Sequence, residues 1–205
     1  IDYRNYPMFF DCGNDAGLAV AGLNFPGYAE YAEGPVDGKN NIAAYEFPLW
    51  VAATFSTVDE VEAALRDTVI VAKSAGEGLG VSLLHWIIGD SQRSIVVEMM
   101  ADGLHVYDDP VDTLANQPTF PWHMENLRTY ITATSDLPSR FVKAAYLNAN
   151  YPQKESETEN VVRMFRSLEG VVMIEGASRM GDGKFEKTIY TGCFSARTGN
   201  YYYAI

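Results

Sequence analysis

The chain has 205 residues, of which 47% are hydrophobic, and its 27 acidic and 15 basic residues give a formal net charge of −12. This length and apolar content favour a single domain with its own core. The negative charge argues against nucleic acid and anionic membrane surfaces as partners, because both attract clustered lysine and arginine.

Hydropathy and cysteine usage indicate a cytoplasmic protein. No apolar run reaches the length of a membrane span, so no membrane partner is expected. The first residues, IDYRNYPMFF, do not have the pattern of a signal peptide. The two cysteines, at positions 12 and 193, form neither a CxxC pair nor a disulfide framework, which favours a reducing compartment.

The N-terminal part of the chain predicts a hairpin. The apolar runs 7–12 and 17–23 flank an Asn-Asp-Ala-Gly turn, which indicates two neighbouring antiparallel strands. The second run ends at Asn24, and a Phe-Pro-Gly turn then leads the chain away. Asn24 either caps its own turn or stands at the mouth of a pocket, and the local residues leave both interpretations open.

Strands and helices then follow in runs. Helices are expected over 44–55, with Pro48 in the first turn, and over 56–67, where Thr57 and Glu60 have the spacing of a capping box. The remaining predicted elements are strands at 82–90, 94–100 and 104–109, helices at 121–131, 139–150 and 155–170, and a hairpin of 186–195 with 200–204. Runs of each type, without strict alternation, predict an α+β fold with helices layered on antiparallel sheet.

Neither metal nor cofactor is expected. The three histidines, at positions 85, 105 and 123, share no ligand spacing. His85 lies in an apolar strand and is interpreted as a hydrogen-bonded core or edge histidine. The glycine-rich stretch 75–82 lacks the spacing of a dinucleotide-binding loop.

Three stretches carry a family resemblance: GLNFPGY at 22–28, LANQPTFPWHMENL at 114–127 and PSRFVKAAY at 138–146. In this order they resemble the choloylglycine hydrolases, the bile salt hydrolases and penicillin V acylases of the N-terminal-nucleophile hydrolase superfamily. The likeness covers nearly the whole chain and is greatest to bile salt hydrolases of intestinal Gram-positive bacteria. It implies a four-layer αββα sandwich of two antiparallel sheets flanked by helices.

The resemblance also implies an activity and its residues. The family hydrolyses the amide bond of glycine- or taurine-conjugated bile salts with an N-terminal cysteine, whose own α-amino group serves as the base. An oxyanion hole would be formed by the backbone N–H of Asn24 and the side-chain amide of Asn116, with Arg140 beside the nucleophile. The resemblance further implies a homotetramer.

Other interpretations stay open. Penicillin V acylases tend to have a tyrosine where this chain has Asn24, which favours bile salts but leaves that activity as the alternative. A non-catalytic relative that only binds bile acids is the second alternative. From the residues alone, Asn116 could be a turn residue and Arg140 a solvated surface charge.

The chain also departs from the family. The catalytic cysteine has no counterpart here, because Cys12 matches an internal strand position and Cys193 matches no catalytic position, so these 205 residues alone are expected to be inactive. Residues 1–205 are expected to form one domain without the family's N-terminal strands and without a loop between Ile131 and Pro138. The simplest interpretation is that residues are left out there, and again between Tyr203 and Ile205; the alternative is a genuinely short relative.

If the family roles apply, Asn24, Asn116 and Arg140 should converge in space, beside an open cleft at Asn24. These residues are far apart in sequence, so local structure alone would not bring them together.

Overall fold

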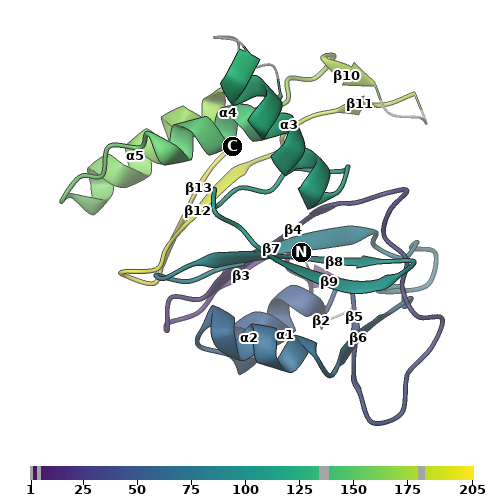
Figure 1. Ribbon diagram of the computed structural model, residues 1–205. Helices are drawn as coiled ribbons and strands as arrows, with labels where there is room; N and C mark the ends of the chain where they lie inside the picture. Colours follow the sequence, from purple (N-terminus) through teal and green to yellow (C-terminus); the bar gives the residue numbers. More distant parts are fainter. Residues whose placement is uncertain (1, 4–5, 134–138, 180–182) are drawn as a thin grey trace.

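The computed structural model describes residues 2–3, 6–133, 139–179 and 183–205. A five-stranded antiparallel sheet in the order β3-β4-β7-β8-β9 lies at its centre (Figure 1). Its strands are β3 (Asp11–Gly13), β4 (Ala19–Asn24), β7 (Leu84–Gly89), β8 (Ser94–Met100) and β9 (Gly103–Asp108).

Helices cover both faces of this sheet. Helices α1 (Phe47–Thr54) and α2 (Val58–Leu65) lie on one side, and α3 (Phe120–Ala133), α4 (Arg140–Ala149) and α5 (Glu157–Glu169) lie on the other (Figure 1). The hairpin of β12 (Thr191–Ser195) and β13 (Asn200–Ala204) stands beside the sheet and contacts α5. The order helix, sheet, hairpin, helix agrees with the predicted α+β class and αββα layering.

Side chains join the hairpin to the central sheet. Tyr190 Oη donates to Asp11 Oδ1 over 2.7 Å, and the Tyr201 hydroxyl donates to the other oxygen of the same carboxylate. Asp11 belongs to β3, the edge strand of the sheet. The hairpin is therefore held at the β3 edge by contacts between residues about 180 positions apart in the sequence.

One strand pair was not expected from the sequence. Strands β5 (Asn40–Ala43) and β6 (Thr68–Val71) pair in parallel, and the two helices between them form the crossover. A parallel pair needs such a long connection, so the same helices that cover the sheet also make this pairing possible. The other small pairs are antiparallel: β1 (Asp2–Tyr3) with β2 (Tyr6–Pro7), and β10 (Ser178–Arg179) with β11 (Phe185–Glu186).

The predicted N-terminal hairpin is present, with different bounds. Strand β3 pairs antiparallel with β4, with Cys12 opposite Val20. It spans 11–13, whereas the expected strand spanned 7–12. Strand β4 includes Asn24, because the Phe25 N–H still donates to the Leu83 carbonyl of the neighbouring strand over 2.8 Å. Pairing with β7 therefore extends the strand to the turn that begins at position 26.

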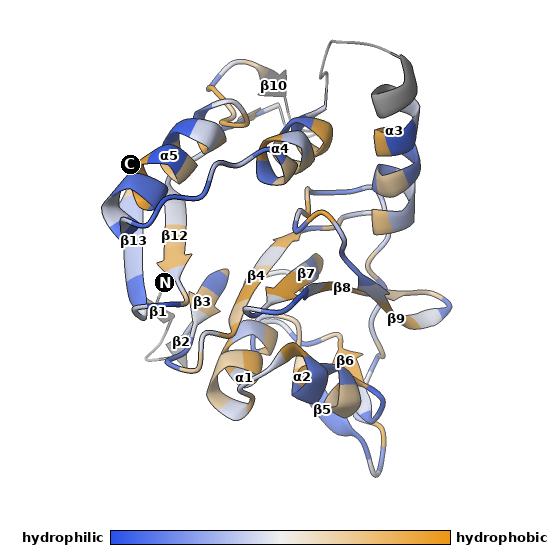
Figure 2. Cartoon of the chain, turned by 60° about the vertical axis from the view of Figure 1, so that its left-hand side comes forward, coloured by the Kyte–Doolittle hydropathy of each residue, from blue (hydrophilic) through white to orange (hydrophobic). Residues whose placement is uncertain are grey.

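The main core lies between the sheet and helices α1 and α2. Alternate residues of β8 face opposite sides, so that Ile95 and Val97 join this core while Val96 and Glu98 face α3 and α4. Hydrophobic colour is strongest on strands of the central sheet such as β3, β4 and β7 (Figure 2). The fully buried residues of this main core include Leu18, Phe47, Val51, Val58, Val61, Ile70, Trp86 and Ile88.

A second core lies on the opposite face of the sheet. It consists of Val96, Phe120, Leu127, Phe141, Val142 and Ala145, from β8, α3 and α4. Val111, Leu114 and Ala115, from the segment between β9 and α3, pack against it, so this core helps to position that segment.

The helix ends agree closely with the sequence. The side chains of Ser139 and Ser156 cap α4 and α5. Helix α5 ends at Glu169 with Gly170 as its C-cap, which agrees with the predicted end at residue 170. Helix α1 has Pro48 in its first turn but begins at residue 47, three residues later than expected. The expected junction between Ile131 and Pro138 falls on 134–138, outside the described residues, whereas β13 pairs without a break through Ala204.

The cap of α2 provides a stability test. Thr57 Oγ1 accepts from the Glu60 N–H over 3.2 Å, and Glu60 Oε2 accepts in turn from the Ser56 N–H over 2.7 Å. We expect Thr57→Ala to lower the free energy of unfolding by about 1 kcal/mol, because one N–H at the helix start loses its acceptor. Urea unfolding measures this loss, and Thr57→Ser, which keeps the hydroxyl, should lose far less. Equal loss in both variants would contradict the capping role.

Candidate active site

Asn24 lies at the end of β4, exposed at the end of the central sheet. The next residue, Phe25, directs its N–H toward β7. Successive backbone groups of a strand alternate in direction, so the N–H and C=O of Asn24 both face the opposite edge. The carbonyl is used there, because it accepts from the Gln117 N–H over 3.1 Å.

Asn116 lies in the segment that joins β9 to α3, and its side chain is half-buried. Asn116 Nδ2 donates to Glu186 Oε1 over 3.3 Å. The peptide bond one residue further along, between Gln117 and Pro118, is cis. Since Gln117 bonds to the Asn24 carbonyl, the structure brings the Asn24 and Asn116 segments side by side across 92 positions of sequence.

The pair offers two kinds of hydrogen-bond donor. One is a backbone N–H at a strand end, and the other is a side-chain amide on a neighbouring loop. Donors of these kinds stabilise the negative charge that develops on a carbonyl oxygen during acyl transfer. The role of Asn24 and Asn116 as such donors stays a prediction, and the contact between their segments is compatible with it.

Arg140 is placed differently. It is the first residue of α4, is exposed, and donates from Nε to the Val171 carbonyl over 2.9 Å. This contact joins α4 to the segment after α5. Among the contacts of the described residues, none joins Arg140 to Asn24 or Asn116, so the structure brings two of the three predicted residues together. The role of Arg140 beside the nucleophile stays a prediction.

Two histidines and a glutamate, from β7, α3 and β8, contact the segment that contains Asn116. His85 Nε2 lies 2.9 Å from the Ala115 carbonyl oxygen, and His123 Nε2 lies 2.9 Å from the Asn116 carbonyl oxygen. Glu98 Oε1 lies 3.0 Å from His85 Nδ1. The prediction that His85 is a hydrogen-bonded core histidine is confirmed. The contact of His123 was missed, because a histidine on the apolar side of a helix gives no sign of its partner.

Burial lowers the pKa of His123, although the hydrogen bond to the Asn116 carbonyl acts in the opposite sense. The nearby His85 lowers this pKa further and Glu98 raises it. In the unfolded chain the ring has its ordinary pKa near 6.5, so it binds a proton there more readily than in the folded state. Stability from this residue is therefore present above that pKa and is lost as pH falls below it.

This gives a pH prediction. Lowering the pH from about 7.5 to about 5 should reduce the free energy of unfolding more for the unmodified protein than for His123→Gln, which cannot titrate. Urea unfolding at the two pH values measures the difference. An identical pH dependence in both proteins would show that His123 does not titrate in this way.

The two thiols are not activated. Burial, together with the Asp11 carboxylate, raises the pKa of Cys12 to about 11, and Cys12 Sγ donates to the Pro48 carbonyl. Burial and Glu157 raise the pKa of Cys193. A thiol attacks as its thiolate, so these shifts make both cysteines weak nucleophiles near neutral pH.

Cavities lie elsewhere on the chain. One of about 500 Å³ lies between the sheet and the β12–β13 hairpin, and both cysteines line it. The described cavities are not lined by Asn24 or Asn116, so the open cleft expected beside Asn24 is not among them. Asn24 instead lies at the surface.

Neither a metal-ion site nor a membrane-spanning helix is found in the described part of the chain. Within those residues, no three His, Cys, Asp or Glu side chains are grouped so that they could hold a metal ion. No helix there has both the length and the apolar character required to cross a bilayer.

The sequence matches the profile of a known family. The family is described as linear amide C–N hydrolases, choloylglycine hydrolase family, and the matched segments are residues 1–136 and 133–205. A bile salt hydrolase/transferase of Bifidobacterium longum subsp. longum is 49% identical over 96% of this chain and 71% of its own length. A conjugated bile acid hydrolase of Lactobacillus acidophilus is 41% identical over 96% of this chain and 72% of its own length.

Solved structures give the same comparison. A mutant of the conjugated bile acid hydrolase from Clostridium perfringens superposes with a TM-score of 0.90 at 35% identity, covering 100% of this chain and 71% of that one. Penicillin V acylase from Agrobacterium tumefaciens superposes with a TM-score of 0.79 over 96% of this chain and 62% of that one. Its identity is 21%, so it shows a shared fold only.

Proposed function

Since the chain belongs to the choloylglycine hydrolase family of linear amide C–N hydrolases, we propose that it hydrolyses the amide bond of glycine- or taurine-conjugated bile salts. Relatives from Bifidobacterium longum and Lactobacillus acidophilus, at 49% and 41% identity over 96% of the chain, are described as acting on bile salts or conjugated bile acids. The proposal transfers that substrate class to this chain.

The observation that carries the proposal is the pairing of the Asn24 and Asn116 segments. The Gln117 N–H to Asn24 carbonyl bond sets the two segments next to each other. A substrate carbonyl oxygen placed between them could accept from the Asn24 N–H and from Asn116 Nδ2. Both donors strengthen their bonds as the oxygen gains negative charge, which favours the tetrahedral transition state over the substrate.

The reaction follows from this arrangement and a cysteine thiolate. The thiolate attacks the amide carbonyl carbon and forms a C–S bond, and the oxyanion is held by the two donors. Collapse breaks the C–N bond, and glycine or taurine leaves after taking a proton at nitrogen. Water then attacks the thioester, which releases the free bile acid and regenerates the thiol.

Neither Cys12 nor Cys193 is proposed as the nucleophile. Cys12 and Cys193 have raised pKa values and lie away from Asn24 and Asn116 among the cavity-lining residues. We propose that the intact protein uses an N-terminal cysteine, with its α-amino group near neutral pKa as the base. Arg140 is proposed to act on that thiolate.

An assay on one preparation of the intact protein tests the substrate. Incubation with a glycine-conjugated bile salt, a taurine-conjugated one and penicillin V, followed by mass spectrometry of the products, measures each activity. We expect free bile acid with glycine or taurine, at higher kcat/KM than for penicillin V. Cleavage of penicillin V alone would favour the acylase alternative, and binding of bile salts without any product would favour a non-catalytic relative.

Two further properties stay proposals. The resemblance implies a homotetramer, and the composition favours the cytoplasm. Light scattering coupled to size-exclusion chromatography measures the mass of the assembly, and cell fractionation locates the protein. A monomer, or recovery outside the cytoplasm, would contradict them.

A further inference from the structure

Two buried histidines donate to consecutive carbonyls at Asn116. His85 Nε2 faces the Ala115 oxygen and His123 Nε2 faces the Asn116 oxygen, each over 2.9 Å. A carbonyl oxygen can only accept, so each ring carries a proton at Nε2. The contact between His85 Nδ1 and Glu98 Oε1 then needs a proton of its own. The rings come from β7 and α3, so two separate elements fix the backbone on both sides of one peptide bond.

Glu98 holds the His85 ring. The Glu98 and His85 side chains are both 0% exposed, and Glu98 Oε1 lies 3.0 Å from His85 Nδ1. The same oxygen accepts from the Phe120 N–H over 2.9 Å, at the start of α3. Phe25 stacks on one face of the imidazole, with ring centroids 4.2 Å apart. The ring is thereby fixed in plane and in position.

His123 is held in a similar way. The residue is 5% exposed, and its ring stacks on Phe141 of α4 with centroids 4.7 Å apart. Its Nδ1 has no hydrogen-bond partner in the described structure. Burial lowers its pKa, which agrees with a neutral ring that donates from Nε2.

The chain from 115 to 120 is consequently fixed at four places. The Ala115 and Asn116 carbonyls accept from the two rings, the Gln117 N–H donates to the Asn24 carbonyl, and the Phe120 N–H donates to Glu98. Free movement of the backbone would spread the Asn116 amide over many positions. When the backbone is fixed on both sides of Asn116, the amide group can move mainly by changing its side-chain rotamer. An oxyanion donor needs such a preorganised position.

We propose that His85, Glu98 and His123 are positioning residues, which act through the Asn116 backbone and do not touch the substrate. The inference rests on the proposed function, because it takes Asn116 as an oxyanion donor. A displacement of a reacting group by about 1 Å can cost roughly a hundredfold in rate, so loss of one of these bonds should affect turnover.

His123 gives the clearest test, because two amide residues distinguish its nitrogens. A glutamine amide nitrogen can take the place of Nε2, whereas the shorter asparagine amide reaches only toward Nδ1. In the intact protein, His123→Asn should lower kcat for a glycine-conjugated bile salt by about tenfold or more, with KM within about twofold. His123→Gln should retain most of the activity.

A double mutant separates positioning from a general loss of structure. If His123 acts through Asn116, adding His123→Asn to Asn116→Ala should lower kcat no further. Urea unfolding of every variant checks that each is folded under the assay conditions, so that differences in kcat do not reflect unfolding. Unchanged kcat in His123→Asn, or an equal further loss in the Asn116→Ala background, would overturn the inference while leaving the proposed function in place.

A spectroscopic measurement makes the inference independent of activity. Nitrogen-15 NMR at neutral pH should find the His123 ring neutral and protonated at Nε2. A ring protonated at Nδ1 would overturn the inference. Absence of bile salt hydrolysis by the unmodified protein, with the Nε2–H ring observed, would instead refute the proposed function and the assignment of Asn116.

Discussion

Replacing Asn116 by alanine is expected to lower kcat for conjugated bile salts by roughly a hundredfold or more, with little change in KM. The physical reason is that the side-chain amide strengthens its hydrogen bond only as charge develops on the carbonyl oxygen. Asn116 Nδ2 donates to Glu186 Oε1, so a bound substrate would replace this partner. Steady-state kinetics on the intact protein measures both constants.

Asn150 provides a matched control. Its amide donates to the Tyr146 carbonyl over 2.8 Å at the end of α4, and no contact among the described residues joins it to Asn24 or Asn116. Asn150→Ala should leave kcat within about twofold of the unmodified value, because exposed positions rarely affect distant sites. If Asn116→Ala raised KM and left kcat intact, Asn116 would be a substrate-binding residue and not an oxyanion donor.

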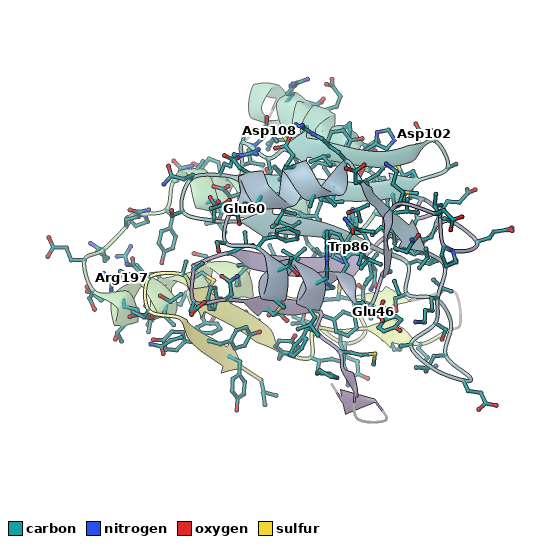
Figure 3. All side chains as sticks on the ribbon, turned by 90° about the horizontal axis from the view of Figure 1, so that it is seen from below. Glu46, Glu60, Trp86, Asp102, Asp108 and Arg197 are labelled. Atoms are coloured by element: carbon teal, nitrogen blue, oxygen red, sulfur yellow. The ribbon has the colours of Figure 1, made fainter. Side chains whose placement is uncertain are left out.

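Replacing Trp86 by alanine is expected to have the largest effect on stability, about 3–5 kcal/mol lower free energy of unfolding. Trp86 is fully buried in β7, and its ring packs on Phe47 of α1 with centroids 4.4 Å apart. A Cβ placed on Gly22 would come within 3.2 Å of the indole, so the neighbouring strand fits closely around it. Figure 3 labels Trp86 near the middle of the molecule, with Asp102 and Arg197 toward its periphery.

Trp122 and a milder change are the controls. Trp122 is 53% exposed on α3, so Trp122→Ala should cost about 0.5 kcal/mol or less. Trp86→Phe should cost less than Trp86→Ala, because it keeps an aromatic ring and removes an indole N–H that has no partner in the described structure. Urea unfolding of the three variants measures these differences. Similar losses for Trp86→Ala and Trp122→Ala would contradict the placement of the core.

Local signals predicted most of the elements. The capping box at Thr57, the helix end at Gly170 and the strand at 94–100 all depend on residues close in sequence, and each is present. Strands β5 and β6 were missed for the opposite reason. The sequence Asn-Asn-Ile-Ala of β5 is short and half polar, and its pairing with 68–71 is made by a crossover that no local pattern reveals.

The candidate site was predictable only in part. Asn24 and Asn116 were identified through the family resemblance, and the structure places their segments together. The contact between His85 and the Ala115 carbonyl was not predicted, because the two residues lie 30 positions apart in the sequence. Arg140 was predicted at a helix start, as found, but its side chain is directed to the Val171 carbonyl, which depends on packing of α5.

The most direct measurement is a crystal structure of the intact protein with a covalent tetrahedral adduct of a conjugated bile salt analogue. The expected result is an oxyanion about 2.7–3.1 Å from both the Asn24 backbone nitrogen and Asn116 Nδ2, with the Gln117 to Asn24 bond retained. An oxyanion bound by other donors, or an adduct on Cys12 or Cys193, would contradict the assignment of this site.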